Sequence, residues 1–355
     1  MRSKKCWAMT TFNPPRDIFT STLSLCERYF LMKPFESFLA PKLEEFLAYR
    51  ERLGYAIRSY RSYLLIFDRY LKEKKAERNS LRPSFFLEMR ANLKMESRSV
   101  NRIISTARAF FQFLVRREYC TENPLKDIPL LKENTIVPYL FSAEQINQLL
   151  KATCKRLRRT KGYFLTDLAL YLAVLLMARC GMRISEPLRL LRHHYRRDDK
   201  TIYIEKTKFK KDRLIPVPKA AITEIENYLS VRRFLLPHDQ NPYLLAGRKQ
   251  KPLTAEQVCY LFRKAIKDIG LDQSRKVIGN MNFSQPTAHS LRHSFAVNTL
   301  KDIRERGEST QHALPILAAY MGHSEYKHTT VYLKFLDAEH RQGLIDFAVS
   351  HQEEI

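Results

Sequence analysis

Apolar residues recur every three or four positions along most of the chain after residue 31, and a stretch without any period interrupts them. Such spacing is typical of amphipathic helices, which bury one face against each other. Residues 127–140 contain Pro129 and Pro138 and show no period, so this stretch is expected to be a linker. A chain of 355 residues is long enough for about two domains. The expected division is an extension over 1–31, a helical domain over 32–126, the linker over 127–140 and a second domain over 141–355.

The first domain is expected to contain four helices and to carry a basic surface. Its last helix has the clearest pattern, with apolar residues from Val100 to Leu114 at spacings of three and four. Arginines lie between these positions and are interpreted as DNA contacts, although a merely solvated helix face would show the same charges. The expected helices cover about 41–54, 60–71, 83–93 and 100–114, and the arginines are Arg98, Arg102 and Arg108.

The second domain is expected to be mostly helical with one small antiparallel sheet. Residues 201–205 and 213–217 are strand-like, and the lysine-rich residues between them indicate a hairpin loop. Capping boxes that begin at Ser142 and Thr254 mark helix starts. The expected fold is therefore mainly α, with an α+β second domain. The expected helices of this domain cover about 143–153, 164–180, 219–233, 255–268, 288–303 and 313–321.

The charge of the chain indicates its partner. Lysine and arginine outnumber the acidic residues by 62 to 37, which gives a net charge of +25. An excess of this size points to a polyanionic partner, most often nucleic acid. It does not indicate any chemistry, because a ribosomal protein or a simple DNA-binding protein has the same balance.

Several classes of protein are not expected. The longest apolar run, Leu168 to Ala178, is far shorter than the roughly 20 residues of a membrane helix. No apolar signal region follows the basic N-terminus, and the six cysteines form no C-x-x-C pair. A reduced, cytoplasmic compartment without a zinc site therefore fits better. The nine glycines form no nucleotide-binding fingerprint, so neither a cofactor nor a metal is expected.

Four short segments of the second domain hold residue types that can bind and cleave a phosphodiester. Two of them contain an arginine motif, one contains a row of lysines, and one contains a histidine followed by a tyrosine nine positions later. The segments are Cys180–Leu190 (CGMRISEPLRL), Lys206–Pro216 (KTKFKKDRLIP), His289–His293 (HSLRH) and Met321–Tyr332 (MGHSEYKHTTVY).

Together these segments resemble the tyrosine recombinase, or phage integrase, family. The family pattern is G-x-R-x-S-E, a lysine in a β-hairpin ahead of R-x-x-P, then H-x-x-R, then G-H-S with a tyrosine nine residues past that histidine. The chain matches each element in order, and His323 and Tyr332 meet the tyrosine spacing. Over residues 33–126 the resemblance rests on the four-helix pattern alone, which is like the SAM-like, core-binding domain of the family.

The resemblance implies a role for each matched residue. Arg183 and Arg292 would clamp the scissile phosphate, and Glu186 would hold the architecture around Arg183. His289 and His323 would donate hydrogen bonds to the phosphate or assist proton transfer. All of these residues lie in the second domain, which is therefore expected to be the catalytic one.

The nucleophile and the acid are assigned in the same way. Tyr332 would attack and form a 3′-phosphotyrosyl link, while Tyr320 is expected in the core and Tyr326 lies too close to the histidine. Lys208 would protonate the leaving 5′ oxygen, because the R-x-x-P match selects it among the neighbouring lysines. His293 is interpreted as a helix-face or supporting residue. The other residues expected to contact DNA here are Lys210, Lys211 and Arg213.

The chemistry of phosphodiester cleavage requires these residue types. The phosphate gathers negative charge as the nucleophile arrives, and a planar guanidinium donates two parallel hydrogen bonds to it. A phenol with a pKa of about 10 needs a proton acceptor or a positive field to attack near neutral pH. An alkoxide is a poor leaving group, so a positioned acid is required. The covalent intermediate keeps the bond energy, so rejoining needs no ATP.

The resemblance also implies partners and leaves alternatives. A site-specific recombinase of the Xer or transposon-integrase kind would close on double-stranded DNA as a two-domain, C-shaped clamp and act as a homotetramer. The apolar tail beyond Tyr332, with an N-cap at Asp337, would form a helix that packs on a neighbouring subunit or on the same subunit. A type IB topoisomerase shares the chemistry, and a non-catalytic DNA-binding regulator could keep the fold. A need for accessory recombination proteins is also left open.

Overall fold

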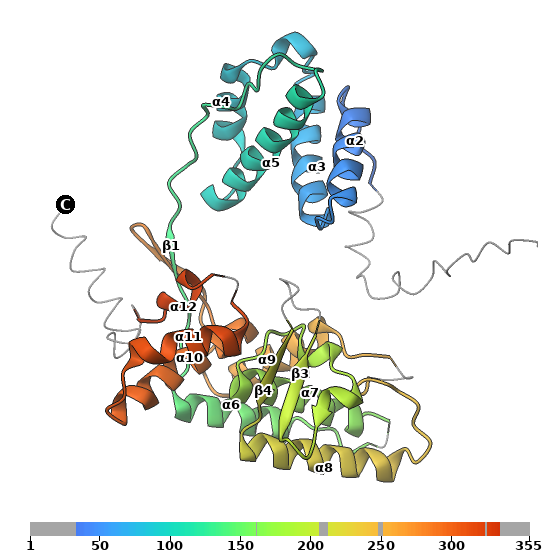
Figure 1. Cartoon of the computed structure of the whole chain (residues 1–355), viewed down its shortest axis with the longest axis vertical. Coiled ribbons are helices and arrows are strands. Elements are labelled where there is room, and N and C mark those ends of the chain that lie inside the picture. Colours follow the sequence, from blue (N-terminus) through green and yellow to red (C-terminus); the bar gives the residue numbers. More distant parts are fainter. Residues whose placement is uncertain (1–32, 161, 206–211, 248–250, 324, 334–355) are drawn as a thin grey trace, which may run out of the picture. The chain divides into compact units, whose positions relative to one another are not determined.

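The computed structural model describes residues 33–160, 162–205, 212–247, 251–323 and 325–333 (Figure 1). The chain divides into two compact units, Met1–Glu133 and Asn134–Ile355. The predicted extension over 1–31, the predicted tail helix and the three loop lysines lie outside the described residues. The expectations for them stay predictions. The loop lysines are Lys208, Lys210 and Lys211.

The first unit packs its helices around an aromatic core. Residues from Val100 to Leu114 bury the apolar face of α5 (Ser97–Arg116), as the spacing predicts. Phe46 meets Phe110 at 5.7 Å and Phe86 meets Phe111 at 5.4 Å, measured between ring centroids, and both pairs are edge to face. The four predicted helices are confirmed as α2 (Ala40–Arg52), α3 (Arg58–Glu73), α4 (Pro83–Asn92) and α5.

The second unit is built around the apolar helix α7 (Phe164–Cys180). Nearly all of its side chains from Thr166 onward are buried, because α6, α8, α9 and α10 pack around it. A helix covered on all sides is apolar around its whole circumference. Apolar as α7 is, no helix among the described residues is long and apolar enough to cross a membrane. The remaining helices are α6 (Ala143–Lys155), α8 (Lys219–Leu235), α9 (Ala255–Asp268), α10 (Ala288–Glu305), α11 (Thr310–Met321) and the short α12 (Lys327–Thr330).

The described part of this unit contains two three-stranded sheets, where the sequence predicts one. The predicted hairpin is confirmed, since β3 (Thr201–Ile204) pairs with β4 (Arg213–Pro216) in antiparallel fashion, and β2 (Tyr195–Arg196) pairs with β3. The second sheet is mixed, because β6 (Met281–Phe283) pairs in parallel with β1 (Thr135–Val137) and in antiparallel fashion with β5 (Lys276–Ile278).

The second half of the predicted linker, 127–140, contains a strand that the lack of a period did not indicate. Residues 135–137 form β1, and Val137 is buried in the same hydrophobic cluster as Phe283 and Tyr332. A three-residue strand has too few positions to show a period of its own. Its pairing with β6, far along the chain, is a tertiary contact.

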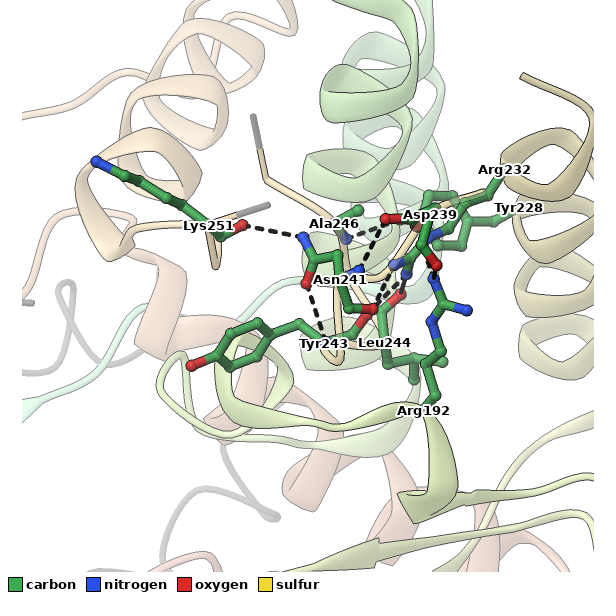
Figure 2. A network of polar contacts seen from close by, with 9 residues as sticks. All are labelled: Arg192, Tyr228, Arg232, Asp239, Asn241, Tyr243, Leu244, Ala246 and Lys251. Atoms are coloured by element: carbon green, nitrogen blue, oxygen red, sulfur yellow. Dashed lines mark hydrogen bonds and ion pairs between the residues drawn. The ribbon is translucent and has the colours of Figure 1, made fainter. Parts of the chain in front are cut away.

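A buried network of polar contacts fixes the loop between α8 and α9 (Figure 2). Arg232 donates through Nε to Asp239 Oδ2 at 2.6 Å and through its Nη atoms to three backbone carbonyls between residues 241 and 244 at 2.7 to 2.9 Å. Arg192 donates to the same Asp239 oxygen at 2.7 Å, and the N–H of residue 244 donates to the Leu190 carbonyl. The loop is therefore joined to the chain that follows the G-x-R-x-S-E segment.

Candidate functional site

The G-x-R-x-S-E segment begins where α7 ends, at a position that only glycine fits. Gly181 has a φ of +58°, and a Cβ there would overlap the Phe295 ring of α10. The Gly181 carbonyl accepts a hydrogen bond of 2.6 Å from Arg292 Nη1. The end of α7 and the second arginine motif are therefore joined directly.

Arg292, on α10, has only 1% of its surface exposed. Its second Nη donates to the carbonyl of Met321, so one side chain connects α10 to the ends of α7 and α11. Burial, together with the nearby charge of Arg183, lowers the pKa of Arg292 to about 9. A buried cation that a second cation repels is stabilised when an anion arrives, which is what a phosphate site requires.

Glu186 orients the first arginine of the motif set. Its carboxylate accepts from Arg183 Nη1 at 3.0 Å and from the Arg183 backbone N–H at 2.8 Å. Arg183 Nη2 donates in turn to the Gly322 carbonyl at 3.0 Å. Burial acts to raise the pKa of Glu186, but Arg213, the Arg183 backbone N–H and the charge of Arg292 together outweigh it, and this pKa lies below its usual value. Glu186 is therefore ionised and can hold Arg183 in one orientation.

Arg213 requires a correction. It was expected to contact DNA, but only 8% of its side chain is exposed. Its Nη atoms donate to Glu186 at 3.1 and 2.9 Å, and its Nε donates to the Tyr320 carbonyl at 2.7 Å. Alternate residues of a strand share a face, and Arg213 shares that of the buried Ile215 on β4. We reassign Arg213 as a residue that positions Glu186.

The G-H-S segment begins at the end of α11. Gly322 ends this helix with a φ of +62°, and the next residue, His323, places Nδ1 2.7 Å from Thr329 Oγ1. Burial and the charge of Arg292 lower the pKa of His323 to about 3, so its ring is neutral near neutral pH. Figure 1 shows α10, α11 and α12 side by side, which brings the histidine and tyrosine motifs together.

Tyr332, two residues after α12, lies inside this arrangement with 3% of its surface exposed. Its ring centroid is 6.1 Å from that of His323, with the planes 30° apart. Burial raises the pKa of the Tyr332 phenol, whereas the charges of Arg292 and Arg183 act in the opposite direction. The structure thus brings the predicted nucleophile together with both predicted arginines.

Two histidines of α10 lie near the tyrosine, and one of them contacts it. His293 Nδ1 is 3.2 Å from Tyr332 Oη, and the two ring centroids are 5.7 Å apart. His289 is exposed, and its ring meets that of His293 at 4.6 Å, nearly at a right angle. The expected role of His293 as a helix-face or supporting residue did not include this contact with the hydroxyl group. The spacing contained an indication, because helical residues four apart lie on one face.

The three arginines expected to contact DNA from the first unit differ in their surroundings. Arg102 is exposed on α5, and Arg98 is exposed but forms an ion pair of 2.9 Å with Glu133. Arg108 donates to two backbone carbonyls in the segment 125–128, at 2.8 and 2.5 Å. These donors hold the chain after α5 against the helix, and a DNA contact of the half-buried Arg108 stays a prediction.

Known proteins resemble both units. Residues 140–339 match the phage integrase family, and residues 43–118 match the phage integrase N-terminal SAM-like domain. The tyrosine recombinase XerD of Rickettsia bellii is 27% identical over 325 residues, which cover 88% of this chain and 99% of that protein.

Solved structures share the fold. The XerH site-specific recombinase bound to a palindromic difH substrate in a post-cleavage complex gives a TM-score of 0.62 at 20% identity, over 86% of this chain and 83% of that one. The lambda integrase tetramer bound to a Holliday junction gives 0.61 at 18% identity, over 87% and 80%.

The fold is that of the tyrosine recombinases, enzymes that break and rejoin DNA. Because the phage integrase match spans more than half of the residues, the chain belongs to the phage integrase family and is a site-specific DNA recombinase.

Proposed function

We propose that this chain cuts duplex DNA one strand at a time, with Tyr332 as the nucleophile, and joins the cut end to a new strand. A bond forms between Tyr332 Oη and the scissile phosphorus, and the bond from phosphorus to the 5′ oxygen breaks. The protein is then linked to the 3′ end of the cut strand. The observation that carries the proposal is the enclosure of the Tyr332 phenol by two arginine charges and two imidazole rings.

The arginines support the electrostatic part of this step. Arg183 and Arg292 both act on the Tyr332 phenol, so a phosphate placed beside Oη would experience both charges. Hydrogen bonds already orient both side chains, through Glu186 for Arg183 and through two backbone carbonyls for Arg292. Charges held in place before the reaction need no reorganisation in the transition state.

The leaving oxygen requires a proton, and Lys208 is the proposed donor. Its loop joins β3 and β4, whose register runs from Thr201 opposite Pro216 to Ile204 opposite Arg213. Arg213 is bonded to Glu186, so one end of the loop starts from the framework of the site. Guanidinium groups would thus neutralise the phosphate and a lysine would supply the proton, and the scheme includes no metal and no nucleotide.

Double-stranded DNA is the proposed substrate and a tetramer the proposed assembly. The net charge of +25 supports binding to a DNA backbone. An apolar groove of about 750 Å³ lies between α10 and α11, and Ile316 on its wall is 74% exposed. We assign this groove to the tail of a second copy, residues 334–355, because apolar residues beyond Tyr332 in the sequence need burial.

A nicked suicide substrate tests the nucleophile, because the short cut end diffuses away and the covalent adduct accumulates. Wild-type protein is expected to form the adduct in EDTA without nucleotide, and Tyr332→Phe to bind the DNA without forming it. Tyr326→Phe is the matched control, since Tyr326 is 49% exposed, and it is expected to form the adduct. An adduct in Tyr332→Phe would contradict the assignment.

The two alternatives predict other results. A type IB topoisomerase relaxes supercoiled DNA of any sequence as a monomer, and a non-catalytic regulator forms no adduct at all. For a recombinase we expect bound DNA to contain inverted half-sites around a short spacer, since symmetric assemblies bind symmetric sites. The match over residues 140–339 favours this outcome.

A further inference from the structure

The contact between His293 and Tyr332 has no counterpart in the roles that the motif set assigns. His293 directly follows Arg292 on α10, and its Nδ1 lies 3.2 Å from Tyr332 Oη. With the imidazole proton on Nε2, Nδ1 accepts a hydrogen bond from the phenol. The ring planes are 61° apart. The contact between Nδ1 and Oη places His293 at the hydroxyl end of a side chain that is almost completely buried.

The surroundings of His293 keep its ring neutral. On its own helix it faces His289, whose ring is 4.6 Å away, and the charge of Arg292. From the chain after α11 it faces His323 and Tyr332. Burial, followed by His289 and Arg292, lowers the pKa of His293 to about 3. A neutral imidazole has a free lone pair, which a protonated one lacks.

We propose that His293 is a catalytic residue, the acceptor of the Tyr332 phenol proton during DNA cleavage, and that it returns this proton during rejoining. The inference rests on the proposed role of Tyr332 as nucleophile. His293 is the histidine whose Nδ1 lies within hydrogen-bond distance of the reacting oxygen, Tyr332 Oη.

The O–H bond of Tyr332 breaks, and its proton moves to His293 Nδ1 while Oη bonds to the scissile phosphorus. The bond to the 5′ oxygen breaks, and that oxygen takes a proton from the loop lysine. The resulting imidazolium would lie beside Arg292, and the negative charge of the bound phosphate offsets the repulsion between them. The phosphate therefore makes His293 more basic when the substrate is present.

The test distinguishes proton removal from Tyr332 from proton donation to the 5′ oxygen by changing the leaving group. A suicide substrate with sulfur in place of the bridging 5′ oxygen releases a thiolate, which leaves without protonation. His293→Asn keeps a polar atom near the position of Nδ1 but cannot take a proton at neutral pH, and His293→Ala removes the contact. His238→Ala is the matched control, since His238 is exposed in the α8–α9 loop.

Both His293 variants are expected to bind DNA with wild-type affinity and to form the adduct on the order of 100-fold more slowly. The sulfur substrate is expected to restore the rate of Lys208→Ala and to leave the His293 variants slow. His238→Ala is expected to react at the wild-type rate on both substrates. His293→Asn decides the result if His293→Ala does not fold.

Three outcomes would overturn the inference. His293→Asn could react at the wild-type rate, or it could regain that rate on the sulfur substrate. It could also react faster than wild type, which would show that the hydrogen bond from Tyr332 to His293 holds the tyrosine in an inactive position. Failure of the proposed function gives a different result, namely no adduct with wild-type protein or an adduct with Tyr332→Phe.

Discussion

Replacing Arg232 with methionine is expected to destabilise the second unit severely, although Arg232 lies outside the candidate catalytic site. Arg232 is 3% exposed, and its guanidinium forms an ion pair with Asp239 and hydrogen bonds to three backbone carbonyls. Methionine has a similar length but no donors. Among the described residues, Asp239 would then keep only Arg192 as a cationic partner, and the carbonyls would lose these donors. Removing one partner of a buried ion pair typically costs about 3–5 kcal/mol.

The cost is measured as a shift in melting temperature. For a unit of this size each kcal/mol corresponds to about 2–4 °C, so a decrease of roughly 6–20 °C is expected. Arg233→Met is the matched control on the next position of α8, where the side chain is exposed, and a change within about 1–2 °C is expected. Equal shifts in the two variants would refute the reasoning, because burial and hydrogen bonding would then not determine the cost.

Four further outcomes are expected. Burial acts to raise the pKa of Asp239, but the Asn241 N–H and the two arginines outweigh it, so folding lowers this pKa. The ionised carboxylate therefore stabilises the fold fully above the unfolded pKa of about 3.9. This contribution to the unfolding free energy is lost as the pH falls through the folded pKa. The difference in unfolding free energy between wild type and Asp239→Asn should thus shrink in acid, and a constant difference would argue against it. Arg183→Ala should slow adduct formation by on the order of 100-fold or more while DNA affinity changes little; cleavage at a wild-type rate in a gel assay would remove Arg183 from the clamp. Affinity for DNA should fall on the order of 1,000-fold between 50 and 200 mM salt if six or more phosphates are contacted, and a flat salt dependence would exclude such binding. Deletion from Gly343 onward and Ile316→Glu should each leave half-site binding intact and impair assembly on a full site, and normal recombination by both would show that the tail and the groove have no role.

Local sequence determined the helices of this protein and the order of its motifs. The residues from Val100 to Leu114 repeat at the period of an α-helix, so the buried face of α5 follows from neighbours three and four positions apart. The same holds for the capping boxes at Ser142 and Thr254, whose reciprocal hydrogen bonds begin α6 and α9. The spacing from His323 to Tyr332 also lies within one short segment. Short-range geometry is sufficient for such features.

Only the tertiary structure decided which side chains meet. Strand β1 exists because β6 pairs with it, and neither strand is long enough to show a period. The expectation of DNA contact for Arg213 followed from its charge, but the folded chain places its guanidinium against the Glu186 carboxylate. The bonds of Arg108 to backbone carbonyls after α5 likewise follow from the fold. The contact of His293 with Tyr332 has the same origin, since it joins α10 to the chain after α12. A residue type states which bonds a side chain can form, whereas packing between distant segments decides which partners lie within about 3 Å of it.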